Sequence, residues 1–76
     1  MPENSFEMQS VTSSQIESVG FNEATNQIKI RFLKNGAEYL YEGCTEDEFN
    51  ELVNAASVGQ QFAASIKGIK SFRRIA

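Results

Sequence analysis

The feature that most constrains the fold is a pair of alternating segments around an Asn-Gly dipeptide. Apolar and polar side chains alternate over residues 28–32 and again over residues 38–42, as expected for strands with one buried face. Asn35-Gly36 lies between these segments, and this dipeptide favours a two-residue hairpin turn because both residues tolerate a positive φ. The sequence therefore predicts an antiparallel hairpin.

A two-residue turn also fixes the predicted register of the hairpin. Phe32 then pairs with Tyr39 and Ile30 pairs with Tyr41, so one face carries aliphatic and aromatic side chains. The opposite face carries two leucines among charged side chains: Lys29, Arg31, Leu33, Glu38, Leu40 and Glu42. We expect the first face to be buried and the second to face solvent or a partner.

The chain before the hairpin is predicted to hold a leader and a first strand. Residues 1–10 are polar, and we expect a mobile leader there. Residues 11–21 suit an extended segment, but the spacing of Ile16 and Val19 breaks strict alternation, which predicts a bulge or bend. Residues 22–26 form the polar loop that leads into the hairpin.

Two short helices are predicted after the hairpin. Thr45 and Glu48 have the spacing of a capping box and precede an apolar stripe, which predicts a helix over about residues 46–56. Ser57 begins a second helix, which we expect to end before Gly68. Strands followed by helices predict an α+β fold, a three-stranded antiparallel sheet with both helices packed on one face.

Length and composition limit the number of domains and the available chemistry. The chain has 76 residues, enough for one small domain, which we place at residues 11–76. One Cys and no His exclude an internal disulfide and His-based acid–base, nucleophile or metal chemistry. The lone Cys44 fits a reducing compartment, and residues 1–10 lack the apolar core of a signal peptide. We expect a cytoplasmic protein without catalytic activity, cofactor, metal ion or membrane span.

A Tyr-x-Tyr motif, Tyr39-Leu40-Tyr41, stands at the centre of an ordered set of positions that spans residues 11–74. The other positions are distributed along the chain: Val11 to Ile16, Val19 to Asn22, Ile28, Ile30, Phe32, Gly36, Phe49, Leu52, Ala55, Ser57, Gly59, Phe62, Ile66 and Arg74. This set resembles the KTSC domain, a family named from a C-terminal domain of some lysyl-tRNA synthetases.

The chain departs from the usual pattern of that family at three places. Gly43-Cys44 stands where Val-Pro is common, Ala63 where Asn is common, and Phe21-Asn22 where Tyr and Asp are preferred. The resemblance implies a small bacterial or phage protein of unassigned function. The association of the family with the synthetase also suggests RNA binding, but only by analogy.

Two interpretations are open for the aromatic side chains of the motif. Tyr39 and Tyr41, with Phe32, are either a platform on which bases stack or a part of the core beneath the helices. We expect the core, because the apolar stripes of both helices need a surface to cover. Arg31, Leu33 and Leu40 on the opposite face then form a candidate contact for a protein partner or a second copy. Scattered exposed leucines are the alternative interpretation.

The charge of the chain is divided unevenly. The net charge is −3, but residues 1–57 hold ten acids and three bases, whereas residues 58–76 hold four bases and no acid. The four bases are Lys67, Lys70, Arg73 and Arg74. They are candidate contacts for nucleic-acid phosphates, together with Lys29, Arg31 and Lys34 if the fold brings these near. The alternative is favourable charge at a helix C-terminus and a solvated tail.

The sequence therefore predicts a small non-catalytic binding module. Its first expected function is protein–protein interaction, with a different protein or as a homodimer. The alternative is an RNA- or DNA-binding module that uses the basic C-terminal end. The acidity of the rest of the chain argues against the alternative, because nucleic-acid binders usually carry a basic surface.

Overall fold

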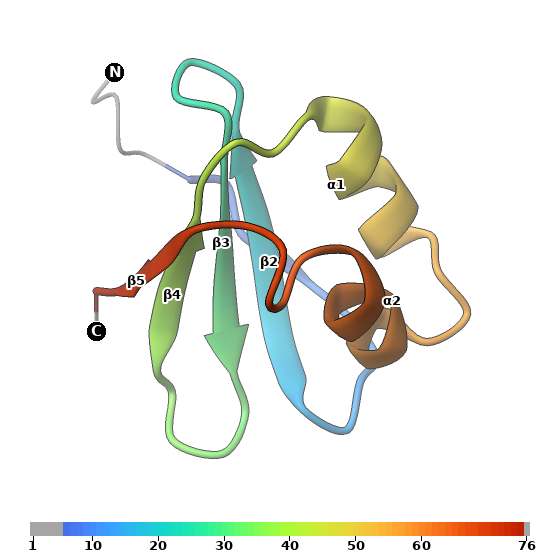
Figure 1. Cartoon of the computed structure of the whole chain (residues 1–76). Coiled ribbons are helices and arrows are strands. Elements are labelled where there is room, and N and C mark those ends of the chain that lie inside the picture. Colours follow the sequence, from blue (N-terminus) through green and yellow to red (C-terminus); the bar gives the residue numbers. More distant parts are fainter. Residues whose placement is uncertain (1–5, 76) are drawn as a thin grey trace.

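A five-stranded antiparallel sheet and two short helices make up the fold in this computed structural model, which describes residues 6–75 (Figure 1). The elements follow in the order β1 (Gln9–Ser10), β2 (Ile16–Asn22), β3 (Gln27–Phe32), β4 (Glu38–Tyr41), α1 (Glu46–Val53), α2 (Val58–Ser65) and β5 (Phe72–Arg74). Neighbouring strands in the chain are neighbours in the sheet. The predicted α+β fold is confirmed, but the sheet has five strands and not three.

The strand β5 returns from the helices to pair with the free edge of β4. Tyr41 pairs with Phe72, and Tyr39 pairs with Arg74. From the sequence we expected only a basic tail here. All three residues of β5 are exposed, so this strand lacks the alternation of buried and exposed positions that would mark it in the sequence. Short edge strands of this kind are common in natural sheets and carry little pattern of their own.

Residues 6–10, which we expected in a mobile leader, lie against the sheet. β1 pairs with β2, and the segment before β1 crosses the outer face of the sheet above Gly20. A Cβ atom at Gly20 would lie 2.7 Å from Met8 Sδ and 3.2 Å from the carbonyl oxygen of Glu7. The absence of a side chain at Gly20 therefore makes room for this segment. The rest of the expected leader, residues 1–5, lies outside the described residues.

The β3–β4 hairpin has the expected partners, but the predicted register is wrong. Ile30 pairs with Tyr39 rather than Tyr41, and the Phe32 backbone N–H donates to the carbonyl of Ala37 at 3.0 Å. The loop between the strands therefore has four residues instead of two. Both registers place the tyrosines on the face of Ile30, because side chains alternate with a period of two.

The observed register separates two leucines that we expected to be neighbours. Leu33 lies in the hairpin loop and is 48% exposed, whereas Leu40 lies in β4 and is only 4% exposed. Arg31 is on the outer face, with Nε 3.4 Å from a carboxylate oxygen of Glu17 and 3.8 Å from one of Glu38. The three residues predicted as a partner contact therefore do not form one exposed surface.

The inner face of the sheet and the two helices share one buried core. Its members come from the strands, the helices and the segments beside them: Ile16, Val19, Ile28, Ile30, Tyr41, Cys44, Leu52, Val58, Phe62 and Ile66. The pairing of β2 with β3 is irregular between Ile16 and Ser18. This bulge brings Ile16 and Val19 to the same face, which confirms the irregularity predicted from their spacing.

Both helices begin at the predicted caps. Thr45 Oγ1 accepts a hydrogen bond from the Glu48 backbone N–H at 3.2 Å, and a carboxylate oxygen of Glu48 accepts from the Thr45 backbone N–H at 3.0 Å. The Ser57 hydroxyl accepts from the Gln60 backbone N–H at 3.4 Å. Each helix has eight residues and is shorter than expected.

The close approach at Gly20 leads to a test of the N-terminal packing. We expect Gly20→Ala to destabilise the fold by about 1 kcal/mol, because the new methyl group overpacks the site. Met8 supplies the nearest atom, so the cost should fall by roughly half or more in a Met8→Ala background, as coupling between touching residues predicts. Urea unfolding of the four proteins measures this coupling. Equal costs in both backgrounds would contradict the packing of Met8 on Gly20.

Candidate functional site

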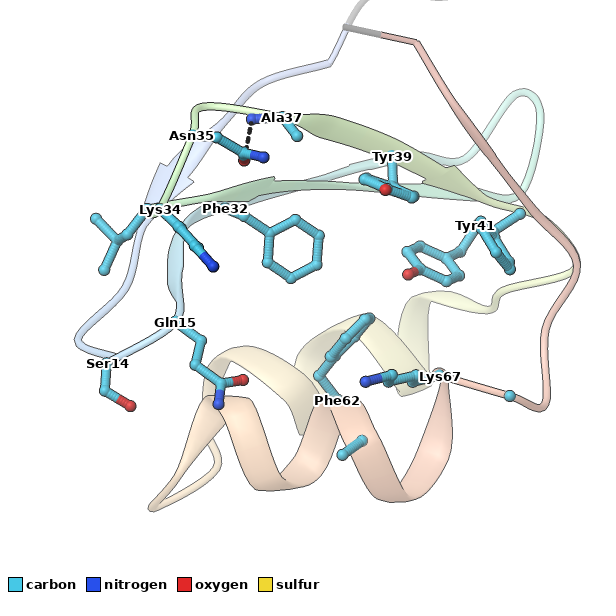
Figure 2. Close-up of a pocket in the computed structure, with 14 residues that line it drawn as sticks. Ser14, Gln15, Phe32, Lys34, Asn35, Ala37, Tyr39, Tyr41, Phe62 and Lys67 are labelled. Atoms are coloured by element: carbon cyan, nitrogen blue, oxygen red, sulfur yellow. Dashed lines mark hydrogen bonds between the residues drawn. The ribbon is translucent and has the colours of Figure 1, made fainter.

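A pocket of about 910 Å³ lies between the hairpin end of the sheet and α2 (Figure 2). Its walls come from the segment before β2, the end of β3 and the loop after it, β4, the second half of α2 with the turn after it, and β5. We call it the aromatic pocket.

Five aromatic rings line the aromatic pocket. Phe62 of α2 contacts two rings of the sheet, with centroids 5.8 Å from Phe32 and 5.3 Å from Tyr41. Phe72 of β5 lies beside both tyrosines, with centroids 5.7 Å from Tyr39 and 5.6 Å from Tyr41. Figure 2 shows Phe32 and Tyr41 below the sheet and Phe62 pointing up toward them from the helix. The rings come from four elements, so the pocket exists only in the folded chain.

The two tyrosines of the motif belong both to the packing of the protein and to the pocket. Tyr41 is 4% exposed and lies in the core cluster, and Tyr39 is half-buried and packs against that cluster. Burial, followed by the proximity of Tyr39, raises the pKa of Tyr41, so its phenol stays neutral around pH 7. Their rings therefore form a wall packed against the core rather than a fully exposed platform.

Backbone hydrogen bonds fix the rim of the aromatic pocket. The Leu33 backbone N–H donates to the carbonyl of Gln15 at 2.9 Å, which ties the hairpin loop to the segment before β2. At the other end, the Lys67 backbone N–H donates to the carbonyl of Phe62 at 2.9 Å, and Gly68 then turns the chain with a φ of 79°. These hydrogen bonds hold Leu33 in the hairpin loop and Lys67 in the turn after α2, both in the lining of the pocket.

The charge of the aromatic pocket is positive. Among residues 6–75, its lining includes two lysines, Lys34 and Lys67, and no carboxylate. Figure 2 shows these lysines on opposite sides of the Phe32–Phe62 pair, with their ammonium groups directed inward. Within the described chain neither lysine forms an ion pair. The pocket therefore combines an aromatic floor with two available cations.

The four bases predicted as a nucleic-acid contact do not gather at one place. Lys67 lines the aromatic pocket, whereas Lys70 bonds the Gly43 carbonyl at 2.8 Å and a carboxylate of Glu48 at 3.1 Å. Arg73 and Arg74 are successive residues of β5, so their side chains point to opposite faces of the sheet. The observed arrangement divides the basic end of the chain into separate positions.

The other bases considered for this contact divide in the same way. Lys29 lies on the outer face, with Nζ 3.2 Å from a carboxylate oxygen of Glu38. Arg31 is on the same face, in the ion pairs described above. Lys34 is the one of the three that lies at the aromatic pocket.

Other reactive or metal-binding groups are not assembled elsewhere in the described chain. Cys44 is fully buried, and burial raises the pKa of its thiol, with a smaller opposing effect from Lys70. This environment disfavours the nucleophilic thiolate. Residues 6–75 hold no group of three or more side chains suited to a metal ion, and no described helix has the length and hydropathy needed to cross a membrane.

Comparison with known proteins identifies the family. The model of the KTSC domain matches residues 12–72. The chain belongs to the KTSC domain family. This match contains all five aromatic residues of the pocket, from Phe32 to Phe72.

The KTSC fold is also seen in a solved structure. The chain is similar to the crystal structure of a KTSC domain protein from Yersinia pestis, with 32% sequence identity and a TM-score of 0.89. The match covers 95% of this chain and 100% of the Yersinia chain. Among curated proteins, none matches this sequence.

Sequence analysis did not identify Phe62 and Phe72 as site residues. Phe62 has the spacing of an ordinary core residue in an amphipathic helix, and it does lie in the core. The only signal at Phe72 is a large aromatic residue within an otherwise basic tail. Its position beside the tyrosines depends on the pairing of β5 with β4, which the sequence does not show.

The contacts of Glu48 lead to a pH-dependent prediction. Burial acts to raise the pKa of this carboxyl, but the Thr45 backbone N–H and Lys70 outweigh it and hold the pKa below its ordinary value of 4.5. A lowered pKa stabilises the fold above pH 4.5, and this stability is lost as the pH falls through the lowered value.

We therefore expect Glu48→Gln to cost roughly 0.5 to 1 kcal/mol at pH 7, because the ion pair and the helix-dipole interaction are lost. The difference from the wild-type protein should shrink as the pH falls from 4.5 through the lowered pKa of the folded state, because Glu48 is then protonated in the unfolded state and finally in the folded state as well. Urea unfolding at pH 7 and at pH 3 measures this difference in the free energy of unfolding. Glu46→Gln, in the same helical turn and exposed, is the matched control. A constant difference across this range would contradict the assigned interaction.

Proposed function

We propose that this KTSC domain is a non-catalytic binding module for a protein partner, and that the aromatic pocket is its binding site. The observation that carries this proposal is the exposed apolar surface at the pocket opening. Phe72 is 58% exposed and Leu33 is 48% exposed, although both line the pocket. Large exposed apolar groups beside a concave site are typical of surfaces that bind a partner.

The residue types of the pocket support a protein partner. Aromatic side chains are enriched at the centres of protein interfaces, where they contribute much of the binding energy. The ring wall is held in place by the core, so little ordering is needed on binding. A pre-ordered apolar wall of this kind suits the insertion of a side chain from another protein.

The same residues support a binding role rather than catalysis. Among the residues that line the pocket, Ser14 carries the hydroxyl group that most resembles a catalytic nucleophile. Within the part of the chain that the structure describes, the pocket lining supplies neither a His nor a carboxylate to accept its proton. Burial raises the pKa of Tyr41, so its phenol is neutral at pH 7 and is not a base either. We therefore propose recognition without chemical conversion.

A capture experiment tests this function. We expect Leu33→Ser and Phe72→Ser to lose specific protein partners that the wild-type chain retains from a lysate of its source cells. Ile75→Ser is the matched control, because Ile75 is also exposed but does not line the pocket. Mass spectrometry compares the retained proteins. A set of partners that all four chains retain equally, or no specific partner at all, would contradict the proposal.

Nucleic acid is the second candidate, and one observation favours it. Five aromatic rings with two lysines are the elements with which proteins bind single-stranded RNA, through stacking and phosphate contacts. In that case the affinity for a single-stranded RNA should fall steeply with salt, and Lys67→Glu should reduce both the affinity and the salt dependence. A mobility-shift titration at two salt concentrations measures both. An RNA affinity that changes neither with the salt concentration nor in Lys67→Glu would exclude RNA binding at this pocket.

A further inference from the structure

We infer that the partner segment bound by the aromatic pocket carries a bulky apolar or aromatic side chain flanked by carboxylates. This inference rests on the proposed protein-binding function and specifies the chemistry of the partner. It combines two features of the site: the aromatic floor, which favours an apolar side chain, and the lysines at its two ends, which favour acidic neighbours.

The apolar part of the segment is indicated by the rings and their exposure. Phe62 and Tyr41 form the buried end of the pocket, and Phe72 leaves more than half of its surface in solvent. An inserted aromatic side chain contacts these rings and removes the exposed face of Phe72 from water. Apolar burial and ring–ring contact both stabilise that arrangement. A volume of about 910 Å³ exceeds the needs of one side chain, so flanking residues also enter the opening.

The acidic part is indicated by the charge of the opening. Lys34 and Lys67 are exposed, lie on opposite sides of the aromatic floor and have no carboxylate partner among residues 6–75 (Figure 2). A carboxylate on each side of the inserted ring can meet one of the two ammonium groups. A basic segment placed there would instead bring like charges together.

The charges outside the pocket favour a short acidic segment over a long polyanion. Three other bases are already paired with carboxylates. Lys29 and Arg31 are paired on the outer face, and Lys70 is paired with Glu48 in the first turn of α1. The chain as a whole has a net charge of −3. Three of the five bases outside the pocket are therefore neutralised by carboxylates, and Arg73 lies on the outer face, whereas binding of a nucleic-acid backbone depends on many phosphate contacts.

A designed peptide provides the probe. The fluorescein-labelled peptide Gly-Ser-Asp-Glu-Phe-Glu-Asp-Ser-Gly carries one aromatic side chain between carboxylates. We expect saturable binding to the full chain by fluorescence anisotropy. Replacing the acids of the peptide by lysines, or its Phe by Ala, should each weaken binding by about tenfold or more, as the loss of a central contact does. Replacing the acids by serines should give a smaller loss, of roughly threefold or more.

Matched charge reversals in the protein locate the site. Lys34→Glu and Lys67→Glu should each weaken binding of the acidic peptide by about tenfold, because a favourable contact becomes repulsive. Arg73→Glu makes the same change of charge in β5, on the outer face of the sheet, and should stay within about twofold of the wild-type affinity. Thermal unfolding of all variants checks that each chain is folded, and Lys34, in the exposed loop, is the variant least coupled to the core.

The outcomes separate this inference from the function on which it rests. Equal binding of the acidic and lysine peptides, equal loss in Arg73→Glu, or no binding of the acidic peptide would overturn the inference. Pocket-dependent capture of protein partners that persisted in any of those cases would leave the proposed function standing. Displacement of the peptide by a single-stranded RNA at lower concentration would overturn the inference in favour of nucleic acid.

Discussion

The pairing of β4 with a strand on each side is the constraint on which the aromatic pocket depends. Pairing with β3 places both tyrosines of the motif on the inner face, where Tyr41 contacts Phe62 of α2. Pairing with β5 places Phe72 beside those tyrosines. Lys70 reinforces the second pairing, because it bonds the Gly43 carbonyl and the carboxylate that caps α1. The two edges of one four-residue strand thus connect the hairpin, the helices and the C-terminal segment.

The parts of the fold that could be predicted are those with a local physical signature. The capping box of Thr45 and Glu48 is a short-range hydrogen-bond pattern, and it forms as expected. The bulge near Ile16 follows from a break in alternation that only an extra residue can repair. The face of each tyrosine was also predictable, because alternation alone determines it.

The register of the hairpin could not be predicted from the same pattern. A two-residue and a four-residue loop keep every side chain of the hairpin on the same face, so alternation does not distinguish them. The hydrogen bonds of Phe32 with the far side of the loop select the longer loop. This change moves Leu33 out of the sheet and to the opening of the pocket, where it joins Phe72. A shift of two residues thus decides which leucine is exposed.

The candidate site was harder to predict than the fold because its residues have two roles. Sequence analysis treated core and binding surface as alternatives for Tyr41, yet this residue is buried against the helices and also lines the pocket. In a chain of 76 residues, one aromatic cluster can supply both a large part of the core and the floor of a site. A substitution of Tyr41 therefore changes stability and binding together. The exposed residues of the rim, Leu33 and Phe72, are the positions that separate the two roles.

The distribution of charge determines how the proposed partner is selected. At long range an acidic partner meets a chain of net charge −3, which is weakly repulsive. Attraction begins only when carboxylates come within about 8 Å of Lys34 or Lys67 at physiological salt, because screening weakens more distant contacts. Long-range electrostatic attraction therefore contributes little to binding at this site, and binding depends on close contact with the aromatic rings. Selectivity for a short acidic segment then follows from two lysines spaced across an apolar floor, rather than from the charge of the whole protein.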